Sequence, residues 1–323
     1  MTGTVPAVSV VIPYFNAGRF IDATLGRLAE QTFRDFEVVI VDDGSSPEEA
    51  RLAEEAAARW RATCVRQDNA GPGSARNRGA GLARGEWIAF LDADDRWDET
   101  KLARQMAVAA DFDMVLCDTR TMTLDGALLG HHRWSAYDRQ AFANAVLRGD
   151  VFSFTSSILI RTDAFRALGG FDPRLRFLED HHLLYRAVRT LRWTCLDEAL
   201  SFRMVHEDSM SHLSRNLDFS AHVARRKLFL DVMSEFESGL DKAPHLLREL
   251  HSNIKRCIAL RRRGDALGMA LQAIRLDPVC LKTYGLCGAI ALSILLPGLF
   301  EQWNPALANR ARNNGTGRTR PCP

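Results

Sequence analysis

A short apolar segment that ends abruptly in acidic residues constrains the fold more than any other feature of the sequence. Residues 87–91 are apolar and have the length of a buried strand, and three carboxylates follow within four positions, Asp92, Asp94 and Asp95. The interior of a sheet does not hold such charge, so we expect the chain to leave the sheet here and open onto solvent or a ligand. Carboxylates this close repel one another unless a cation lies between them, and Mg²⁺ or Mn²⁺ binds such oxygen ligands. The alternative is an acidic turn in which Asp95 or Asp98 caps the next helix.

This segment belongs to a regular alternation of strand and helix patterns. Apolar runs predict strands at 8–12, 37–41, 63–66 and 87–91, and helical patterns lie between them at about 21–31, 46–61 and 74–83. The alternation predicts right-handed crossovers and an α/β fold with a mainly parallel central sheet flanked by helices. Ligands of such sheets bind at the carboxyl ends of the strands, so the polar residues that follow the strands are candidates for a site.

The second half of the chain is less regular. We predict strands at 114–117 and 153–160, a hairpin turn at Asp125-Gly126, and a strand at about 200–205 that leads to His206. The end of this last strand is compatible with a functional histidine or with an ordinary surface strand.

An acidic pair opens the helix predicted after residue 177. Glu179 and Asp180 lie in its first turn, where the helix dipole favours negative charge, so helix capping alone would explain them. His181 and His182 follow directly, and we expect them to face an acceptor or to lie on the helix surface.

The composition limits the partners and the compartment. With 323 residues, 46% of them hydrophobic, the chain can bury a full core and has room for an appendage. A net charge of +2 provides no general attraction to nucleic acid. The seven cysteines form no CxxC pair, which favours a reducing compartment. The N-terminus lacks the pattern of a signal peptide, so we expect the protein to act in the cytoplasm.

Five motifs, taken in order, resemble those of family 2 inverting glycosyltransferases with the GT-A fold. The resemblance covers about 8–206, roughly two-thirds of the chain, and five motifs in register are far more specific than one. The motifs are Val8-Ser9-Val10-Val11-Ile12-Pro13, Val41-Asp42-Asp43-Gly44-Ser45, Asn69-Ala70-Gly71 through Ala75-Arg76-Asn77, Leu91-Asp92-Ala93-Asp94-Asp95, and Glu179-Asp180.

The resemblance implies a role for each matching position. The nucleotide-sugar donor would contact Pro13, Phe15, Asp43, Arg76 and Asp92. A divalent cation, Mn²⁺ or Mg²⁺, would be held by Asp94, with His206 at the metal or the diphosphate, and Asp180 would be the general base. Phe15 as a core aromatic and Asp43 as a turn former are the plain alternatives.

Two further residues are assigned to the acceptor side. Glu179 adjoins the expected base, and Trp97 follows the acidic motif. Helix capping is the alternative for Glu179, and packing in the core is the alternative for Trp97.

The chain is expected to divide into a GT-A domain at 1–215, a helical extension at 216–308 and a disordered tail at 309–323. Residues 283–300 carry no charge, but they are shorter than the roughly 20 apolar residues of a spanning helix and are interrupted by Pro297-Gly298. They fit an interfacial or re-entrant helix, or a helix buried in a subdomain. Basic residues at 255–256 and 261–263 would suit anionic lipid, so we expect peripheral attachment to the inner face of the cell membrane.

The predicted function is metal-assisted, inverting transfer of a sugar, with a UDP-sugar as the expected donor, onto a glycan or a lipid-linked acceptor. A non-catalytic protein that binds nucleotide sugars is the first alternative. A phosphohydrolase with Asp92 as nucleophile fits less well, because its motif should follow the first strand. A dinucleotide-dependent dehydrogenase lacks its GxGxxG turn.

Overall fold

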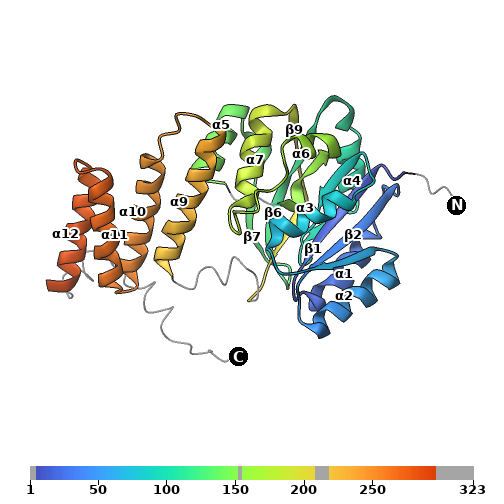
Figure 1. Cartoon of the computed structure of the whole chain (residues 1–323), viewed down its shortest axis with the longest axis horizontal. Helices are drawn as coiled ribbons and strands as arrows, with labels where there is room; N and C mark the ends of the chain where they lie inside the picture. Colours follow the sequence, from blue (N-terminus) through green and yellow to red (C-terminus); the bar gives the residue numbers. More distant parts are fainter. Residues whose placement is uncertain (1–4, 152–154, 208–217, 296–323) are drawn as a thin grey trace. The chain divides into compact units, whose positions relative to one another are not determined.

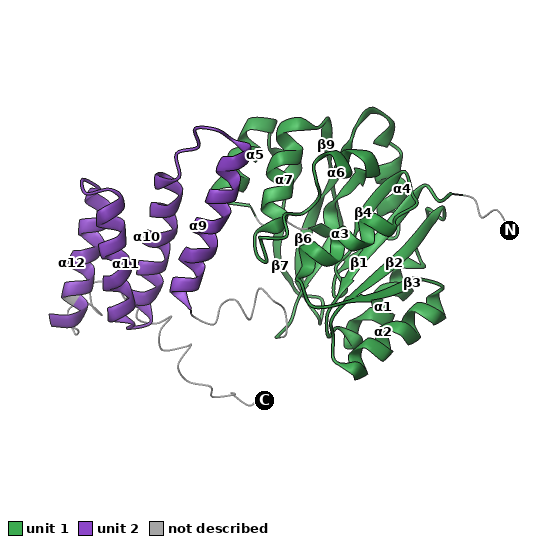
Figure 2. Ribbon diagram, viewed as in Figure 1, with its two compact units in different colours: residues 1–216 green, residues 217–323 purple. Residues whose placement is uncertain are grey.

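The computed structural model describes residues 5–151, 155–207 and 218–295. The chain forms two compact units, residues 1–216 and 217–323 (Figures 1 and 2). The boundary predicted from the sequence, between residues 215 and 216, is one residue earlier. The first unit is α/β, and the described part of the second is helical.

A nine-stranded sheet organises the first unit, in the order β3-β2-β1-β4-β8-β6-β9-β5 with β7 paired to β6. Strands β1 to β4 run parallel to one another, as do β6 and β9, whereas β8 is antiparallel to both β4 and β6. The predicted α/β fold with a mainly parallel sheet is therefore confirmed. The strands are β1 Val8–Tyr14, β2 Phe36–Asp43, β3 Thr63–Gln67, β4 Trp87–Phe90, β5 Arg96–Trp97, β6 Met114–Thr123, β7 Leu128–His132, β8 Leu159–Arg161 and β9 Trp193–Val205.

Helices cover both faces of the parallel strands because successive side chains of each strand point to opposite faces. Val10, Ile12 and Ile40 belong to the cluster that includes the buried residues of α1 (Gly18–Leu28) and α2 (Pro47–Trp60). Val39 and Val41 pack instead with Ala75 of α3 (Pro72–Leu82). Figure 1 shows α1 and α2 on one side of the sheet and α3 on the other.

The second helix begins as its sequence predicts. The Ser46 hydroxyl accepts the Glu49 backbone N–H at 3.4 Å, and Pro47 occupies the first helical position. The remaining helices of the unit are α4 Lys101–Met106, α5 Arg139–Arg148, α6 Thr162–Ala167 and α7 Glu179–Thr190.

Two predicted strands in the second half have different bounds in the structure. Of the strand predicted at 153–160, only Leu159 and Ile160 lie in β8; Thr155–Ser157 form a 3₁₀ turn, and residues 152–154 lie outside the described residues. The turn forms because the hydroxyls of Thr155 and Ser156 contact Asp92 and Asp95. Strand β9 starts at Trp193 instead of residue 200, since it pairs with β6 along its whole length.

The second unit has its own core. Its helices are α9 Phe219–Phe236, α10 Ala243–Ala259, α11 Arg263–Leu276 and α12 Leu281–Leu295, and their apolar faces meet around Ile254 and Ala270. None of the helices described is both long and apolar enough to span a membrane. Part of the uncharged segment 283–300, and the whole predicted tail at 309–323, lie outside the described residues.

Candidate active site

The loops that follow β1 and β2 lock into each other at the carboxyl edge of the sheet. The Asn16 backbone N–H donates to the Ser45 hydroxyl at 2.9 Å, and the Ser46 N–H donates to Asn16 Oδ1 at 3.0 Å. Asn16 has a positive φ of 48°, an uncommon conformation that these contacts hold in place. The preceding residue, Phe15, is 52% exposed, so the plain alternative of a core aromatic is wrong.

Asp43 is buried and holds the loop that leads into α3. Its Oδ1 accepts the Ala70 N–H at 2.9 Å and the Gln67 side-chain amide at 2.7 Å, while its Oδ2 accepts the Gly71 N–H at 2.8 Å. Gly71 has a φ of 93°, which glycine adopts at little cost. The Asp43 carboxylate thus has internal partners on both oxygens, and its contact with a nucleotide stays a prediction.

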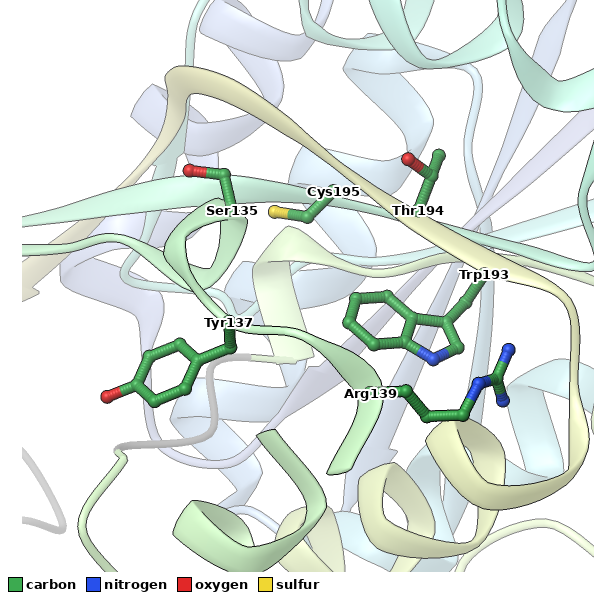
Figure 3. A pocket seen from close by; sticks show the side chains of 6 residues that line it. All are labelled: Ser135, Tyr137, Arg139, Trp193, Thr194 and Cys195. Atoms are coloured by element: carbon green, nitrogen blue, oxygen red, sulfur yellow. The ribbon is translucent and has the colours of Figure 1, made fainter. Parts of the chain in front are cut away.

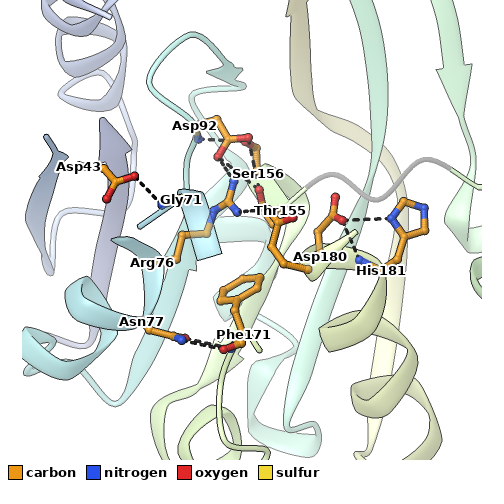
Figure 4. A network of polar contacts seen from close by, with 11 residues as sticks. Asp43, Gly71, Arg76, Asn77, Asp92, Thr155, Ser156, Phe171, Asp180 and His181 are labelled. Atoms are coloured by element: carbon orange, nitrogen blue, oxygen red, sulfur yellow. Dashed lines mark hydrogen bonds and ion pairs between the residues drawn. The ribbon is translucent and has the colours of Figure 1, made fainter. Parts of the chain in front are cut away.

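Arg76 of α3 is the centre of a buried ionic network (Figure 4). Its Nη2 lies 2.7 Å from Asp92 Oδ1, after β4, and its Nη1 lies 3.0 Å from Glu179 Oε1, at the start of α7. The guanidinium also lies over the ring of Phe171, 5.4 Å from its centroid. Although burial opposes the charge, Asp92 and Glu179 raise the pKa of Arg76, so it stays a cation. Two segments 87 residues apart in the sequence are thereby joined at one point.

The two carboxylates that begin α7 have pKa values shifted in opposite directions. Burial, and then the charge of Asp180, raise the pKa of Glu179 to about 7. Burial acts the same way on Asp180, but the charge and hydrogen bonds of His181 and the charge of Arg76 outweigh it and lower its pKa. Asp180 is therefore the ionised member of the pair near neutral pH. Leu178, immediately before them, has a positive φ of 63°, which fixes the entry to the helix.

We expected all three carboxylates after β4 to open onto solvent or a ligand. For Asp95 this expectation is wrong, because its side chain is buried. It is 5% exposed; its Oδ2 accepts the Ser156 hydroxyl at 2.6 Å and its Oδ1 accepts the Met204 N–H at 3.2 Å. Burial and the neighbouring carboxylates Asp94 and Asp92 raise its pKa. The expected helix cap is not made by Asp95 or Asp98: Thr100 is the N-cap of α4, and the Asp98 carboxylate accepts the Thr100 N–H, at 3.0 Å.

Asp94, just before β5, and His206, just after β9, meet beside these two paired strands. Asp94 Oδ2 lies 2.9 Å from His206 Nε2, and the imidazole packs at a tilt of 40° against the ring of Phe20, with ring centroids 4.4 Å apart. Asp94 keeps 30% of its side chain exposed. Among the residues that the structure describes, no three His, Cys, Asp or Glu side chains form a complete metal site. One carboxylate and one imidazole fit a cation whose other ligands are phosphate oxygens and water, which is how Mg²⁺ is usually bound.

The two acceptor-side assignments have other surroundings in the structure. Trp97 is 6% exposed, belongs to the main core, and donates its indole N–H to the Ser156 carbonyl at 2.7 Å, which agrees with the core-packing alternative. Its ring also lies 3.8 Å from the ammonium of the buried Lys101. Glu179 is buried against Arg76. Both residues contact other residues of the site: Trp97 contacts Ser156, and Glu179 contacts Arg76.

A separate pocket of about 270 Å³ is lined by six residues, which Figure 3 shows from close by. Trp193, in its wall, is level with Ile88 near the start of β4, whereas the carboxylates follow the end of that strand. Polar groups of the pocket are already engaged: the Trp193 indole and Arg139 donate to the Val188 carbonyl, and the Ser135 hydroxyl donates to Asp118. This pocket is not the site. Its walls are Ser135, Tyr137, Arg139, Trp193, Thr194 and Cys195.

Three residues of the network were not assigned a role from the sequence. Thr155 lies 3.3 Å from both oxygens of Asp92, and His181 bonds Asp180 (Figure 4). Ser156 bonds Asp95. His181 and His182 are buried, so the expectation that they lie on the helix surface is wrong, and their place facing an acceptor stays a prediction. Only adjacency to Asp180 pointed to His181, and no pattern in the sequence points to the two hydroxyls.

A mainly parallel sheet with an acidic motif after its fourth strand, and a second acidic pair brought to that motif by Arg76, is the arrangement of glycosyltransferases with the GT-A fold. Residues 9–169 match the sequence model described as glycosyl transferase family 2. The chain belongs to this family.

Named relatives agree with the assignment. The glycosyltransferase EpsH of Bacillus subtilis (strain 168) is 33% identical over 196 residues, which span 56% of this chain and 56% of EpsH. The amylovoran biosynthesis glycosyltransferase AmsB of Erwinia amylovora is 26% identical over 286 residues, 82% of this chain and 87% of AmsB. Among solved structures, residues 1–349 of S. aureus TarS in complex with UDP-GlcNAc superpose with a TM-score of 0.62 at 19% identity, covering 96% of this chain and 93% of that one. This last likeness concerns the fold.

Proposed function

We propose that this protein transfers a sugar from a nucleoside-diphosphate donor, a UDP-sugar, to a hydroxyl of a glycan or lipid-linked acceptor, with inversion at the anomeric carbon. The observation that carries the proposal is the bridge made by Arg76. It joins Asp92, on the donor side, to Glu179, the neighbour of Asp180, within 2.7 and 3.0 Å. A carboxylate that can accept a proton is thereby held beside the acidic motif.

Asp180 would act as the general base. An acceptor hydroxyl is a weak nucleophile, and a positioned carboxylate can take its proton as the oxygen attacks the anomeric carbon. The bond between that carbon and the diphosphate oxygen breaks as the new glycosidic bond forms on the opposite face. One displacement inverts the configuration and needs only one catalytic carboxylate, unlike a retaining hydrolase.

Asp94 and His206 would hold a divalent cation, Mn²⁺ or Mg²⁺, at the donor diphosphate. Such a cation offsets the negative charge that grows on the leaving diphosphate. The chain's own contribution is to place Asp94 and His206 2.9 Å apart at the rim of the sheet. Phe15, exposed beside this rim, would contact the nucleotide base together with Pro13 and Asp43.

The donor and acceptor classes are supported by relatives. TarS, which has the same fold, is described in complex with UDP-GlcNAc, and the name of AmsB places it in the biosynthesis of a polysaccharide. We propose a cell-envelope or secreted polysaccharide as the destination of the transferred sugar.

Release of nucleoside diphosphate from a panel of nucleotide sugars, with and without Mn²⁺, tests the function. We expect metal-dependent release by the wild type, loss of release in Asp94→Ala, and loss of transfer with donor binding retained in Asp180→Asn. Asp111→Ala, which changes an exposed acid in the 3₁₀ turn just before the start of β6, is the matched control. Release of inorganic phosphate instead would support the hydrolase, and binding without turnover would support a non-catalytic protein.

Attachment to the inner face of the cell membrane is the proposed location. Four leucines of α11 and α12 are between 48% and 85% exposed, and apolar residues on a helix surface favour an interfacial position. They are Leu267, Leu271, Leu281 and Leu295.

Sedimentation with vesicles that contain anionic lipid tests this location. The double substitution Leu281→Glu with Leu295→Glu should reduce binding, while Leu128→Glu with Leu129→Glu, also leucines with more than half of their surface exposed but in the other unit, should not. Equal binding by both variants would exclude the proposed surface.

A further inference from the structure

His181 is held on both sides by hydrogen-bond acceptors. Its Nδ1 lies 3.0 Å from Asp180 Oδ1, and its Nε2 lies 2.9 Å from the backbone carbonyl oxygen of Val151. The ring is 8% exposed. Figure 4 shows the imidazole directed at the Asp180 carboxylate.

The chemistry of these partners determines where the protons are. A carbonyl oxygen only accepts, so Nε2 must carry a proton. An ionised carboxylate also only accepts, so Nδ1 must carry a proton whenever Asp180 is ionised. His181 is then an imidazolium, and its positive charge lies against the negative charge of Asp180 in a buried place, where charge-assisted hydrogen bonds are strong.

Only one oxygen of Asp180 is occupied by these contacts. Oδ1 accepts both the His181 backbone N–H at 2.8 Å and its Nδ1–H. Within 5–151, 155–207 and 218–295, no group donates a hydrogen bond to Oδ2, and the side chain keeps 22% of its surface exposed. Oδ2 is therefore the oxygen of Asp180 that is left available to an incoming hydroxyl.

We propose that His181 is a positioning residue that clamps Asp180 Oδ1, directs Oδ2 toward the acceptor hydroxyl, and ties the base to the loop after α5 through Val151. The inference rests on the proposed role of Asp180 as general base. In the step itself the acceptor proton passes to Oδ2, while His181 keeps both of its protons and neutralises the carboxylate from the side away from the acceptor.

Two amide substitutions separate the two contacts of the ring. Asn places its side-chain NH₂ where Nδ1 stands, so His181→Asn can still donate to Asp180 but cannot reach Val151. Gln places its NH₂ where Nε2 stands, so His181→Gln can donate to Val151 but leaves Asp180 without its side-chain donor. Both variants remove the charge and the ring, which makes each the control of the other.

Steady-state transfer should distinguish them. We expect His181→Asn to keep kcat within about threefold of the wild type, and His181→Gln to lose about 10- to 100-fold in kcat. The KM for the donor should change little in either variant, because the contacts of Arg76 with Asp92 and Glu179 do not involve His181. Equal losses, no loss in either, or a larger loss in His181→Asn would overturn the proposal.

A second measurement is independent of any variant. In ¹⁵N NMR of the wild type near neutral pH, both ring nitrogens of His181 should carry protons, and a bare Nδ1 facing Asp180 would contradict the clamp. If the wild type itself releases no nucleoside diphosphate, the proposed function fails. If Asp180→Asn abolishes transfer while both His181 variants remain fully active, only this inference fails.

Discussion

The Ser156 hydroxyl donates to Asp95 Oδ2 at 2.6 Å and accepts the backbone N–H of Asp92 at 3.1 Å. One side chain, more than sixty residues away in sequence, thus contacts both ends of the acidic motif. Asp95 in turn accepts the Met204 N–H, two residues before His206. The loop that carries Asp94 and the strand that carries His206 are therefore tied through a buried carboxylate.

Removal of the Ser156 hydroxyl should cost both stability and activity. Ser156→Ala leaves the buried Asp95 carboxylate without its shortest hydrogen bond, so we expect the free energy of unfolding to fall by about 1–3 kcal/mol. Donor turnover should also fall, because Asp94 loses its support. Urea denaturation and release of nucleoside diphosphate measure the two effects.

Ser201 of β9 provides the matched control. It is fully buried like Ser156, but its hydroxyl has no hydrogen-bond partner among the described residues. Ser201→Ala should be neutral or slightly stabilising, since it removes a buried polar group that contributes no bond. Equal destabilisation in the two variants would mean that the Asp95 contact is not the cause.

The pKa of Glu179 predicts a pH dependence of stability. Because the folded-state pKa is raised from 4.5 to about 7, mainly by burial, the folded protein binds the proton more tightly than the unfolded chain. The resulting stabilisation is fully present below pH 4.5 and is lost as the pH rises through about 7. Glu179→Gln should remove this component, so the difference in unfolding free energy between wild type and variant should change across that interval. A constant difference would show that Glu179 titrates normally.

The strand ends that form the site were predictable, and the support behind them was not. The apolar runs that stop before Pro13, Asp42 and Asp92 place the ends of β1, β2 and β4 to within two residues, because side-chain periodicity is local information. Whether Asp95 faces solvent or Trp97 faces an acceptor depends on Ser156, which lies in a segment whose apolar pattern predicts a strand. Contacts over such sequence distances leave no local signal. The buried hydroxyl of Ser156 bonds Asp95, and its segment forms a 3₁₀ turn where the apolar pattern predicts a strand.

Replacing Arg76 by lysine should break the bridge between Asp92 and Glu179, because the bridge uses two nitrogens of one guanidinium. Arg76→Lys keeps the charge, but an ammonium is a point donor that cannot span Asp92 and Glu179 as two guanidinium nitrogens do. Because a buried carboxylate is then left without its partner, we expect a destabilisation of about 3–5 kcal/mol, with weaker donor binding. Thermal unfolding and titration with UDP measure both.

The exposed ion pair of Arg51 with Glu55 on α2 is the control for that substitution. Arg51 and Glu55 keep 63% and 52% of their side chains exposed, and surface pairs contribute about 0–1 kcal/mol. Arg51→Lys should therefore leave stability and UDP binding almost unchanged. A comparable loss in both variants would point to a general effect of replacing arginine.

The close packing of α3 on β1 and β2 depends on Gly79. A Cβ added at Gly79 would lie 2.3 Å from Val11 Cγ1 and 3.3 Å from Val41 Cγ2, so Gly79→Ala must push the helix away from β1 and β2. Gly81, two residues later in the same helix, has no atom within 4 Å of an added Cβ. Gly81→Ala should stabilise the protein by about 0.5–1 kcal/mol through the better helix propensity of alanine. Gly79→Ala should instead destabilise it by about 1–3 kcal/mol, as overpacking does in cores.

Because α3 also carries Arg76, displacement of the helix should weaken UDP binding in Gly79→Ala and leave it intact in Gly81→Ala. If both variants gained stability, α3 would not be packed against Val11 as described.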